Sequence, residues 1–345
     1  MTPSGLARAT ALASLAACPF AFSGPAESLD GYAEWRKGET LIGEGQRVVA
    51  SPGMTFKGGG EARDFGSIPI GYEVKVRGER EASGVLVARE VQAKPNGRAL
   101  FEGDLRTAFD QMEAQFLKAG RMFDQDDKGR MQSYGRLYDE GPEVERMRRI
   151  ARRLAPPYLS GDEFRVYVVD NKEWNAMAAP NYSIYVFTGL LRDMDDDEVA
   201  IVLGHELVHA THEHSRKGYK KSLLVQLGAL AGVAIAGEAI DNEAARTAAQ
   251  LAMVLGASAW QNGYGRNHED QADRVGLRYA YEAGYEVSKG PGLWNRFATK
   301  YGGGSKALNF FFGNHSVAKD RARNLERELR LNYSPSDHSR ERPRE

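Results

Sequence analysis

The chain has 345 residues, of which 42% are hydrophobic and 27% are charged, and this composition is typical of a globular protein with room for two domains. Its 46 Lys and Arg nearly balance its 47 Asp and Glu, so no strong overall field favours nucleic acid or an anionic membrane. The single cysteine, Cys18, excludes an intrachain disulfide and a zinc site built from thiolates.

Residues 1–26 predict an export signal. One basic residue, Arg8, is followed by a short apolar run over residues 9–17. The sequence LAAC, which ends at Cys18, resembles a bacterial lipobox, whose cysteine carries a lipid anchor. Cleavage by the ordinary signal peptidase after Ala26 is the alternative. We therefore expect an exported protein of the bacterial periplasm, attached to the membrane only through a lipidated Cys18, with secretion as the alternative destination.

Residues 27–98 predict a small antiparallel β-domain. Short segments at 47–50, 72–76 and 85–88 are rich in β-branched residues, and glycine and proline separate them. The pattern favours a small barrel that is OB-like. No residue in this domain carries evident chemistry, so a folded spacer and a module that binds a substrate or partner are both open interpretations.

Residues 99–134 predict a helical linker. An apolar stripe at helical spacing runs from Leu105 to Leu117, and we expect this helix to end at Met122. The acidic segment at 124–129 begins like a calcium-binding loop. Because a lysine and a glycine replace two of the oxygen ligands, we reject calcium there.

Helices and strands alternate after the linker. A helix is predicted over 143–154, and strands are predicted over 164–169 and 183–187. A strand that stands just before a metal-binding helix can expose its edge to an extended peptide. A last charged helix is predicted over 320–331, ahead of a solvated, disordered tail at 332–345.

The segment at 205–209 reads HELVH, and the rest of the chain is organised around it. Apolar residues at helical spacing surround it, and the acidic run at 195–198 suits a helix start, where unpaired N–H groups favour negative charge. On a helix, His205 and His209 lie one turn apart on one face, so both imidazoles can bind one metal ion. Glu206 lies beside that face, placed to take a proton from a water at the metal. This is the HExxH pattern of zinc peptidases.

A metal on this helix needs a third protein ligand. The longer pattern HExxHxxGxxH fails, because His212 and Ser215 occupy the positions of its glycine and last histidine. Farther along, Glu269 and Asp273 are four residues apart, so one helix face can present a ligand carboxylate and a second carboxylate that orients a metal-bound histidine. We interpret His212 and His214 as polar-face residues or as partners of the ligands.

Four stretches together make the chain resemble the gluzincins of the HtpX-like and CaaX prenyl protease family of zinc metallopeptidases, in its soluble exported branch. The stretches are NAMAAPNYSIYVFTGLL at 175–191, DEVAIVLGHELVHATHEHS at 197–215, YGRNHEDQADRVGLRYA at 264–280 and NHSVAKDR at 314–321. The resemblance implies one zinc ion per chain.

The same resemblance implies a role for each residue of the motif. It places the zinc on three ligands, which are His205, His209 and Glu269. It makes Glu206 the catalytic base and gives Asp273 the task of orienting a ligand.

The resemblance also implies a substrate cleft and two further catalytic residues. The cleft residues are Asn175, Ala176, Ala178, Ala179 and Pro180. His315 falls where the family has a histidine near the metal, and Arg321 falls at a matching arginine. Because Ser316 replaces the usual proline, two roles stay open for His315: it stabilises the oxyanion, or it occupies the open zinc position in a resting state.

The expected fold class is α+β. A mainly helical gluzincin metallopeptidase domain at 135–331, with a small sheet before the HExxH helix, follows the antiparallel β-domain. Between the two metal-binding segments, the apolar run at 223–237 is shorter than the roughly 20 residues that cross a bilayer. We therefore expect helices that pack against each other or over the cleft.

These inferences predict a zinc-dependent endopeptidase that hydrolyses unfolded or extended proteins in the bacterial cell envelope, where the resemblance implies protein quality control. Two alternatives stay open. One is a binding or chaperone-like protein with a gated or weak zinc site, and the other is a zinc hydrolase of a non-peptide amide. No nucleic-acid partner is expected.

Overall fold

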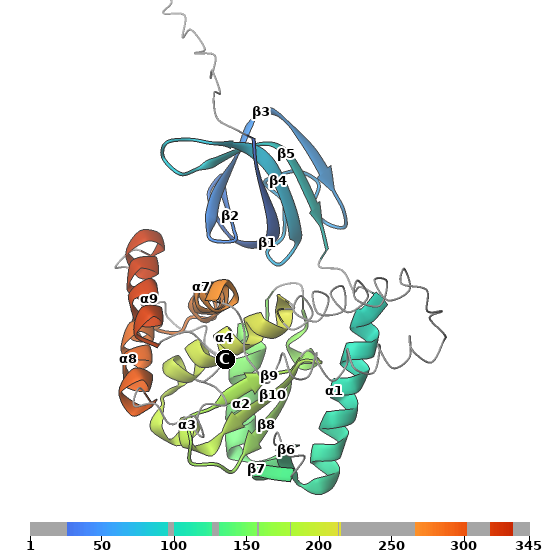
Figure 1. Ribbon diagram of the computed structural model, residues 1–345, viewed down its shortest axis with the longest axis vertical. Coiled ribbons are helices and arrows are strands. Elements are labelled where there is room, and N and C mark those ends of the chain that lie inside the picture. The colour runs from blue at the N-terminus through green and yellow to red at the C-terminus, as the bar shows by residue number, and fades with distance from the viewer. Residues whose placement is uncertain are drawn as a thin grey trace, which may run out of the picture.

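The computed structural model describes residues 26–95, 100–125, 131–156, 159–179, 181–212, 214, 266–301 and 318–333. Figure 1 shows a β-barrel next to a larger unit in which helices surround a sheet. Several predicted features lie outside the described residues: the export signal with Cys18, Pro180, the apolar run at 223–237, His315 and residues 334–345 of the predicted tail. The first two residues of that predicted tail are described: Asn332 is helical and Tyr333 is buried.

Five strands form the barrel. They are β1 (Glu27–Lys37), β2 (Thr40–Gly43), β3 (Gln46–Gly58), β4 (Glu73–Arg80) and β5 (Leu86–Lys94). They close on themselves in the order β1-β2-β3-β5-β4, around a separate apolar core. The three segments predicted from the sequence fall in β3, β4 and β5, and the structure adds β1 and β2.

The barrel is not fully antiparallel, so the prediction is wrong in that respect. β3 and β5 run parallel, with Val48 opposite Leu86 and Phe56 opposite Val91, whereas the other neighbours are antiparallel. The physical reason is the number of strands. A closed ring of five strands cannot alternate direction at every step, so at least one neighbouring pair must be parallel.

A second sheet lies in the larger unit. Its strands, in spatial order, are β6 (Arg121–Gln125), β7 (Met131–Tyr138), β8 (Arg165–Val169), β10 (Ser183–Phe187) and β9 (Ala176–Ala178). β8 and β10 run parallel, and the other neighbours are antiparallel. Among the described strands, β9 stands at the edge next to the helices of the site.

The segment assigned to a helical linker is helical only in its first part. α1 (Leu100–Ala119) ends at Gly120, whose φ of 62° suits the end of a helix. Met122, expected as the last helical residue, lies instead in β6, where it is 1% exposed and packs in a cluster with Phe116 and Leu137. β6 and the beginning of β7 thus extend the sheet into the expected linker.

Helices cover this sheet (Figure 1). The described α-helices after α1 are α2 (Pro142–Leu154), α3 (Thr188–Asp193), α4 (Asp196–Thr211), α7 (Arg266–Glu282), α8 (Gly290–Tyr301) and α9 (Ala318–Asn332). Short 3-10 turns stand at Gly161–Glu163 and Val287–Lys289. In the described part of the chain, no helix is both long enough and apolar enough to span a bilayer.

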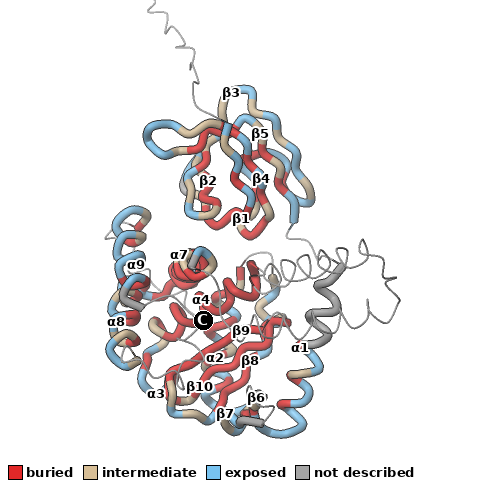
Figure 2. Tube along the Cα trace, in the orientation of Figure 1, coloured by how far each residue is buried: buried red, intermediate tan, exposed pale blue. Residues whose placement is uncertain are grey.

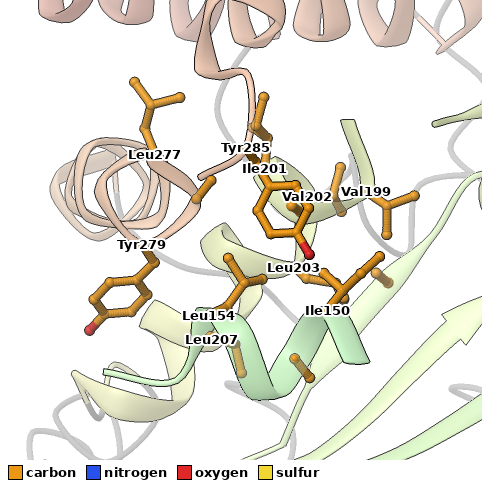
Figure 3. Close-up of a cluster of buried hydrophobic side chains, with 14 of the residues drawn as sticks. Ile150, Leu154, Val199, Ile201, Val202, Leu203, Leu207, Leu277, Tyr279 and Tyr285 are labelled. Atoms are coloured by element: carbon orange, nitrogen blue, oxygen red, sulfur yellow. The ribbon is translucent and has the colours of Figure 1, made fainter. Parts of the chain in front are cut away.

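α4 is buried along nearly its whole length, as Figure 2 shows. Apolar side chains of α4 lie between those of α2 and those of α7 (Figure 3). The labelled members of this core include Val202, Leu203 and Leu207 of α4, Ile150 and Leu154 of α2, and Leu277 and Tyr279 of α7. This packing fixes α4 and α7, the two helices that carry the candidate site, against each other.

Candidate metal centre

The helix that carries HELVH begins at a complete capping box. Asp195 accepts hydrogen bonds from the N–H groups of Asp197 and Glu198, at 3.1 Å each, and the Glu198 carboxylate accepts from the N–H of Asp195. Lys289 pairs with Asp195 at 2.7 Å. Burial opposes the charge of Asp195, but these partners outweigh it and lower the pKa of its carboxyl. The acidic run therefore fixes where α4 starts, as predicted, and thereby where His205 lies.

Three side chains converge between α4 and α7. The Nε2 atoms of His205 and His209 are 3.1 Å apart. Glu269 of α7 places its Oε2 3.6 Å from His205 Nε2 and its Oε1 3.5 Å from His209 Nε2. One ligand atom from each residue lies within 4.8 Å of the others. The structure thus brings together the three residues predicted as metal ligands.

This arrangement fits a zinc ion. Two ring nitrogens that face each other at 3.1 Å, beside a carboxylate, require a proton or a cation between them. Zinc bound to two imidazoles at about 2.0–2.1 Å in tetrahedral geometry would separate their nitrogens by about 3.3 Å. A donor set of two histidines and one glutamate leaves one tetrahedral position for water or substrate. The three side chains are at most 1% exposed, so bulk water does not surround them.

Asp273 and Arg321 hold His205 from the other side of its ring. Asp273 Oδ1 lies 2.9 Å from His205 Nδ1, and Arg321 donates to the two Asp273 oxygens at 2.6 and 2.9 Å. Arg321 Nη2 is also 2.9 Å from His205 Nδ1. The guanidinium of Arg321 cannot accept a hydrogen bond, so a proton on His205 Nδ1 is donated to the Asp273 carboxylate. With the proton on Nδ1, the Nε2 atom of His205 keeps its lone pair for a metal.

Burial and the charge of Arg321 keep the His205 ring neutral. Burial, and then the charge of Arg321, lower the pKa of His205 to about 4, so the ring is neutral at neutral pH, as metal binding requires. Burial also opposes the charge of Asp273. Arg321 and His205 outweigh that effect and lower the pKa of the Asp273 carboxyl, which stays ionised.

Glu206 lies beside this cluster and is 4% exposed. Its Oε1 is 3.8 Å from His205 Nε2 and has no hydrogen-bond partner among the described residues. The carboxyl accepts a hydrogen bond from the N–H of Ala178. Burial, and then the charge of Glu269, raise the pKa of Glu206. Burial makes this carboxyl hold a proton more tightly than an exposed glutamate does, which suits a group that accepts a proton during a reaction.

The predicted cleft residues lie at the edge of the sheet, in or beside β9. Asn175, Ala176, Ala178 and Ala179 are all at most 4% exposed. β9 contacts α4, and the bond from Ala178 joins this strand to Glu206. The structure therefore brings the segment expected to line the cleft next to the residue expected to act as base, whereas Pro180 is outside the described part.

Arg321 is placed differently from an open catalytic residue. It is 1% exposed and points at Asp273, and its guanidinium carbon lies 3.5 Å from the ring centroid of Trp294 in α8. No spacing or motif in the sequence indicates that Trp294 lies near the site. In this structure Arg321 holds Asp273, the partner of His205, and its Nη1 lies 3.7 Å from Oε2 of Glu269.

A second set of contacts lies behind His209. His214 places its Nδ1 2.9 Å from His209 Nδ1, and its Nε2 lies 2.8 Å from Oε1 of Gln271. The sequence permits two interpretations of His214, a polar-face residue or a partner of a metal ligand, and its contact with His209 agrees with the second interpretation. His212 lies at the end of α4 and has its ring against Tyr32 of β1, with 4.8 Å between ring centroids. Sequence spacing gives no signal for Gln271.

Known proteins match this part of the chain. The sequence profile of Peptidase family M48 matches residues 142–329, which is more than half of the chain. "Metalloendopeptidase OMA1, mitochondrial" from Bos taurus is 31% identical over 175 residues, which cover 50% of this chain and 33% of that protein.

Two bacterial proteins are also similar. The "Putative beta-barrel assembly-enhancing protease" of Vibrio cholerae is 28% identical over 176 residues, which cover 50% of this chain and 36% of that protein. "Metalloprotease YcaL" of Escherichia coli is 27% identical over 180 residues, which cover 52% of this chain and 67% of that protein. The match thus spans about a third of the length of the Bos taurus and Vibrio cholerae relatives.

Proposed function

The chain belongs to peptidase family M48, and from that membership we propose that it is a zinc-dependent endopeptidase that hydrolyses peptide bonds in protein substrates. The observation that carries the proposal is the convergence of His205, His209 and Glu269 on one point, with Glu206 beside them. The three ligands would hold one zinc ion. When bound, zinc supplies a Lewis acid for the peptide carbonyl and for the attacking water.

Glu206 is the proposed base. As the water oxygen bonds to the carbonyl carbon, Oε1 of Glu206 takes the proton that the water loses. The same carboxyl then donates this proton to the nitrogen of the breaking C–N bond, so the base ends the cycle ionised. The N–H of Ala178 holds the carboxyl in place, and Asp273 fixes the ring of His205 through its Nδ1.

The edge strand β9 is the proposed substrate platform. β9 pairs antiparallel with β10 and stands at the end of the strand order. An extended peptide that pairs with β9 would lie next to Glu206, because Ala178 of β9 donates its backbone N–H to the Glu206 carboxyl. This placement supports unfolded or extended proteins as substrates, with Asn175 to Pro180 lining the cleft.

Several finer assignments are part of this proposal. We assign the chain to the HtpX-like and CaaX prenyl protease branch on its motifs, although the relatives described above carry other names. The name of the Vibrio cholerae relative supports a role for this chain in quality control of envelope proteins. Export through residues 1–26, a lipid anchor at Cys18 and a catalytic role for His315 complete the proposal. For Arg321, predicted as catalytic, its contacts with Asp273 support a positioning role instead.

The division of the chain is also proposed. The boundaries are a signal at 1–26, a barrel domain at 27–98, a connecting segment at 99–134 and a peptidase domain at 135–331. The strand order of the barrel, with β3 parallel to β5, supports an OB-like fold for the second of these.

Zinc content and proteolysis test the proposal together. We expect one zinc per chain in the wild type and in Glu206→Gln, with cleavage of unfolded casein by the wild type alone. Normal hydrolysis by Glu206→Gln would contradict the assignment of the base, and a wild type without zinc would contradict the whole proposal.

One observation favours a second candidate, a protein whose zinc site is gated. The three ligands and Glu206 are at most 4% exposed, so a substrate must displace part of the chain to reach them. If the wild type and Glu206→Gln both bind zinc and neither cleaves casein, the result would support a gated enzyme or a binding protein.

A further inference from the structure

The barrel is packed directly against the helix that supplies Glu269. β1 contacts α7. Trp35 of β1 stacks on Tyr333 with 5.8 Å between centroids, and Arg278 of α7 lies over the Trp35 ring at 4.3 Å. Glu34, also in β1, is only 2% exposed. A charged side chain buried at such a contact requires hydrogen-bonding partners.

A continuous set of hydrogen bonds runs from the barrel to the metal centre. Gln271 Nε2 lies 2.8 Å from Oε1 of Glu34 and 2.9 Å from Oε1 of Glu44, in the turn between β2 and β3. Gln271 Oε1 lies 2.8 Å from His214 Nε2, and His214 Nδ1 lies 2.9 Å from His209 Nδ1. We call these five residues the barrel relay.

The two barrel carboxylates, Glu34 and Glu44, determine which group donates and which accepts in each hydrogen bond of the barrel relay. Carboxylates accept hydrogen bonds, so the amide nitrogen of Gln271 faces Glu34 and Glu44, and its oxygen faces His214. That oxygen accepts a hydrogen bond, so His214 carries its proton on Nε2. Its Nδ1 is then an acceptor and receives the Nδ1 proton of His209. The lone pair of His209 is left on Nε2, the atom that faces His205 and Glu269.

We infer that the barrel carboxylates act through this relay as positioning groups of the metal centre, and that they select the ring tautomer in which His209 binds the metal. Asp273 performs the same task for His205 by direct contact. The two histidine ligands thus depend on carboxylates from two different parts of the chain. The inference rests on the proposed metal centre, and it extends that centre beyond residues 142–329, the part matched by the family profile.

Arg274 keeps the barrel end of the relay charged. Its Nη1 lies 2.5 Å from Oε2 of Glu34, and its Nε pairs with Asp270 at 2.9 Å. The N–H of Gly45 also donates to Glu34, at 2.9 Å. Burial opposes the charge of Glu34, but Arg274 and these hydrogen bonds outweigh it and lower the pKa of its carboxyl. Glu34 therefore remains an acceptor that fixes the orientation of Gln271.

A matched pair of α7 variants tests the middle of the relay. Gln271→Met keeps the length and volume of the side chain but removes all three of its relay bonds, to Glu34, Glu44 and His214. Arg278→Met weakens a barrel contact on the same helix and leaves the relay intact. We expect Gln271→Met to bind zinc about 10–100-fold more weakly in competition with a chromophoric chelator. The affinity of Arg278→Met should stay within about twofold of wild type.

Tautomers provide a readout that a purely structural role would not change. Long-range nitrogen–proton NMR correlations of isotope-labelled histidine in the zinc-free protein should show His214 protonated on Nε2 in the wild type and in Arg278→Met. In Gln271→Met the same ring should exchange between tautomers. Wild-type zinc affinity and a single His214 tautomer in Gln271→Met would overturn the inference and leave the proposed function intact.

The double variant Glu34→Gln/Glu44→Gln tests the barrel end, and it decides the question if Gln271→Met fails to fold. Amides can present either an N–H or an oxygen to Gln271, so they no longer fix its direction. We expect a zinc affinity between those of the wild type and Gln271→Met. Unchanged affinity and an unchanged His214 tautomer would overturn the role of the barrel. A wild type that binds no zinc would overturn the proposed function itself, and this inference with it.

Discussion

Gly204 of α4 and Gly276 of α7 face each other where the two helices of the metal centre cross. A Cβ atom on Gly204 would lie 2.5 Å from the carbonyl oxygen of Gly276, and one on Gly276 would lie 2.5 Å from the backbone nitrogen of His205. The contact is between backbones and cannot relax by turning a side chain. This close approach lets Glu269 reach the two histidines from the neighbouring helix.

Gly276→Ala should therefore separate α4 from α7. We expect a loss of about 1–3 kcal/mol in the free energy of unfolding, as for other overpacked cores, together with weaker zinc binding. Gly292→Ala in α8 is the control, because its Cβ would meet no atom within 4 Å. That variant should be unchanged or more stable by up to about 1 kcal/mol. Urea unfolding and chelator competition measure both effects, and equal behaviour of the two variants would contradict the crossing argument.

The sequence predicts much of the metal centre because its residues follow local rules. The acidic run sets the start of α4, and the four-residue spacing brings His205 next to His209 and Glu269 next to Asp273 on their own helices. The crossing of α4 and α7 at Gly204 and Gly276, in contrast, is a feature of the tertiary structure. Each glycine is locally only a residue with low helix propensity, so the sequence does not show that the two meet.

The parts that sequence reasoning misses depend on long-range pairing. The parallel pair of β3 and β5 follows from closing an odd number of strands, and a strand pattern does not state which strands are neighbours. Gln271 and Glu34 are 237 positions apart, and their hydrogen bond depends on how the barrel packs on α7. No periodicity within either segment contains that information.

Asp273 should support both stability and metal binding, and the two roles can be separated. Asp273→Asn removes the charge that balances Arg321, which is 1% exposed, so we expect a loss of about 3–5 kcal/mol in the free energy of unfolding. Zinc affinity should fall about 10–100-fold, because the His205 ring loses its carboxylate. Adding Arg321→Met should restore part of the stability and none of the zinc affinity. Recovery of both would show that Asp273 acts only on folding.

Acid should weaken the contact between the barrel and α7. The pKa of Glu34 is lowered in the fold, so its contribution to stability is present above the ordinary value of 4.5 and is lost as the pH falls through the lowered value. The groups around it are Arg274, Glu44 across Gln271, and Glu328. Burial raises the pKa of Glu328, so its contribution has the opposite sign and is lost as the pH rises.

Proteolysis of the barrel between about pH 3 and about pH 7 measures this effect, with an acid-tolerant protease at the lower end. In a Glu328→Gln background, which removes the opposing group, protection of the barrel should decrease in acid. Adding Glu34→Gln should make the protection weak at every pH and nearly independent of pH. A pH dependence that survives Glu34→Gln would assign the effect to other carboxyls.

Zinc removal should destabilise the peptidase unit, because the three ligands are buried together and the ion would be their common partner. A ligand that binds only the folded state stabilises it by about 2.7 kcal/mol when its free concentration is about 100 times Kd. Thermal unfolding of the wild type should therefore shift upward as zinc is added to the chelator-treated protein. Glu206→Gln should keep this shift, whereas His205→Ala should lose it. An equal shift in both variants would mean that zinc binds elsewhere on the chain.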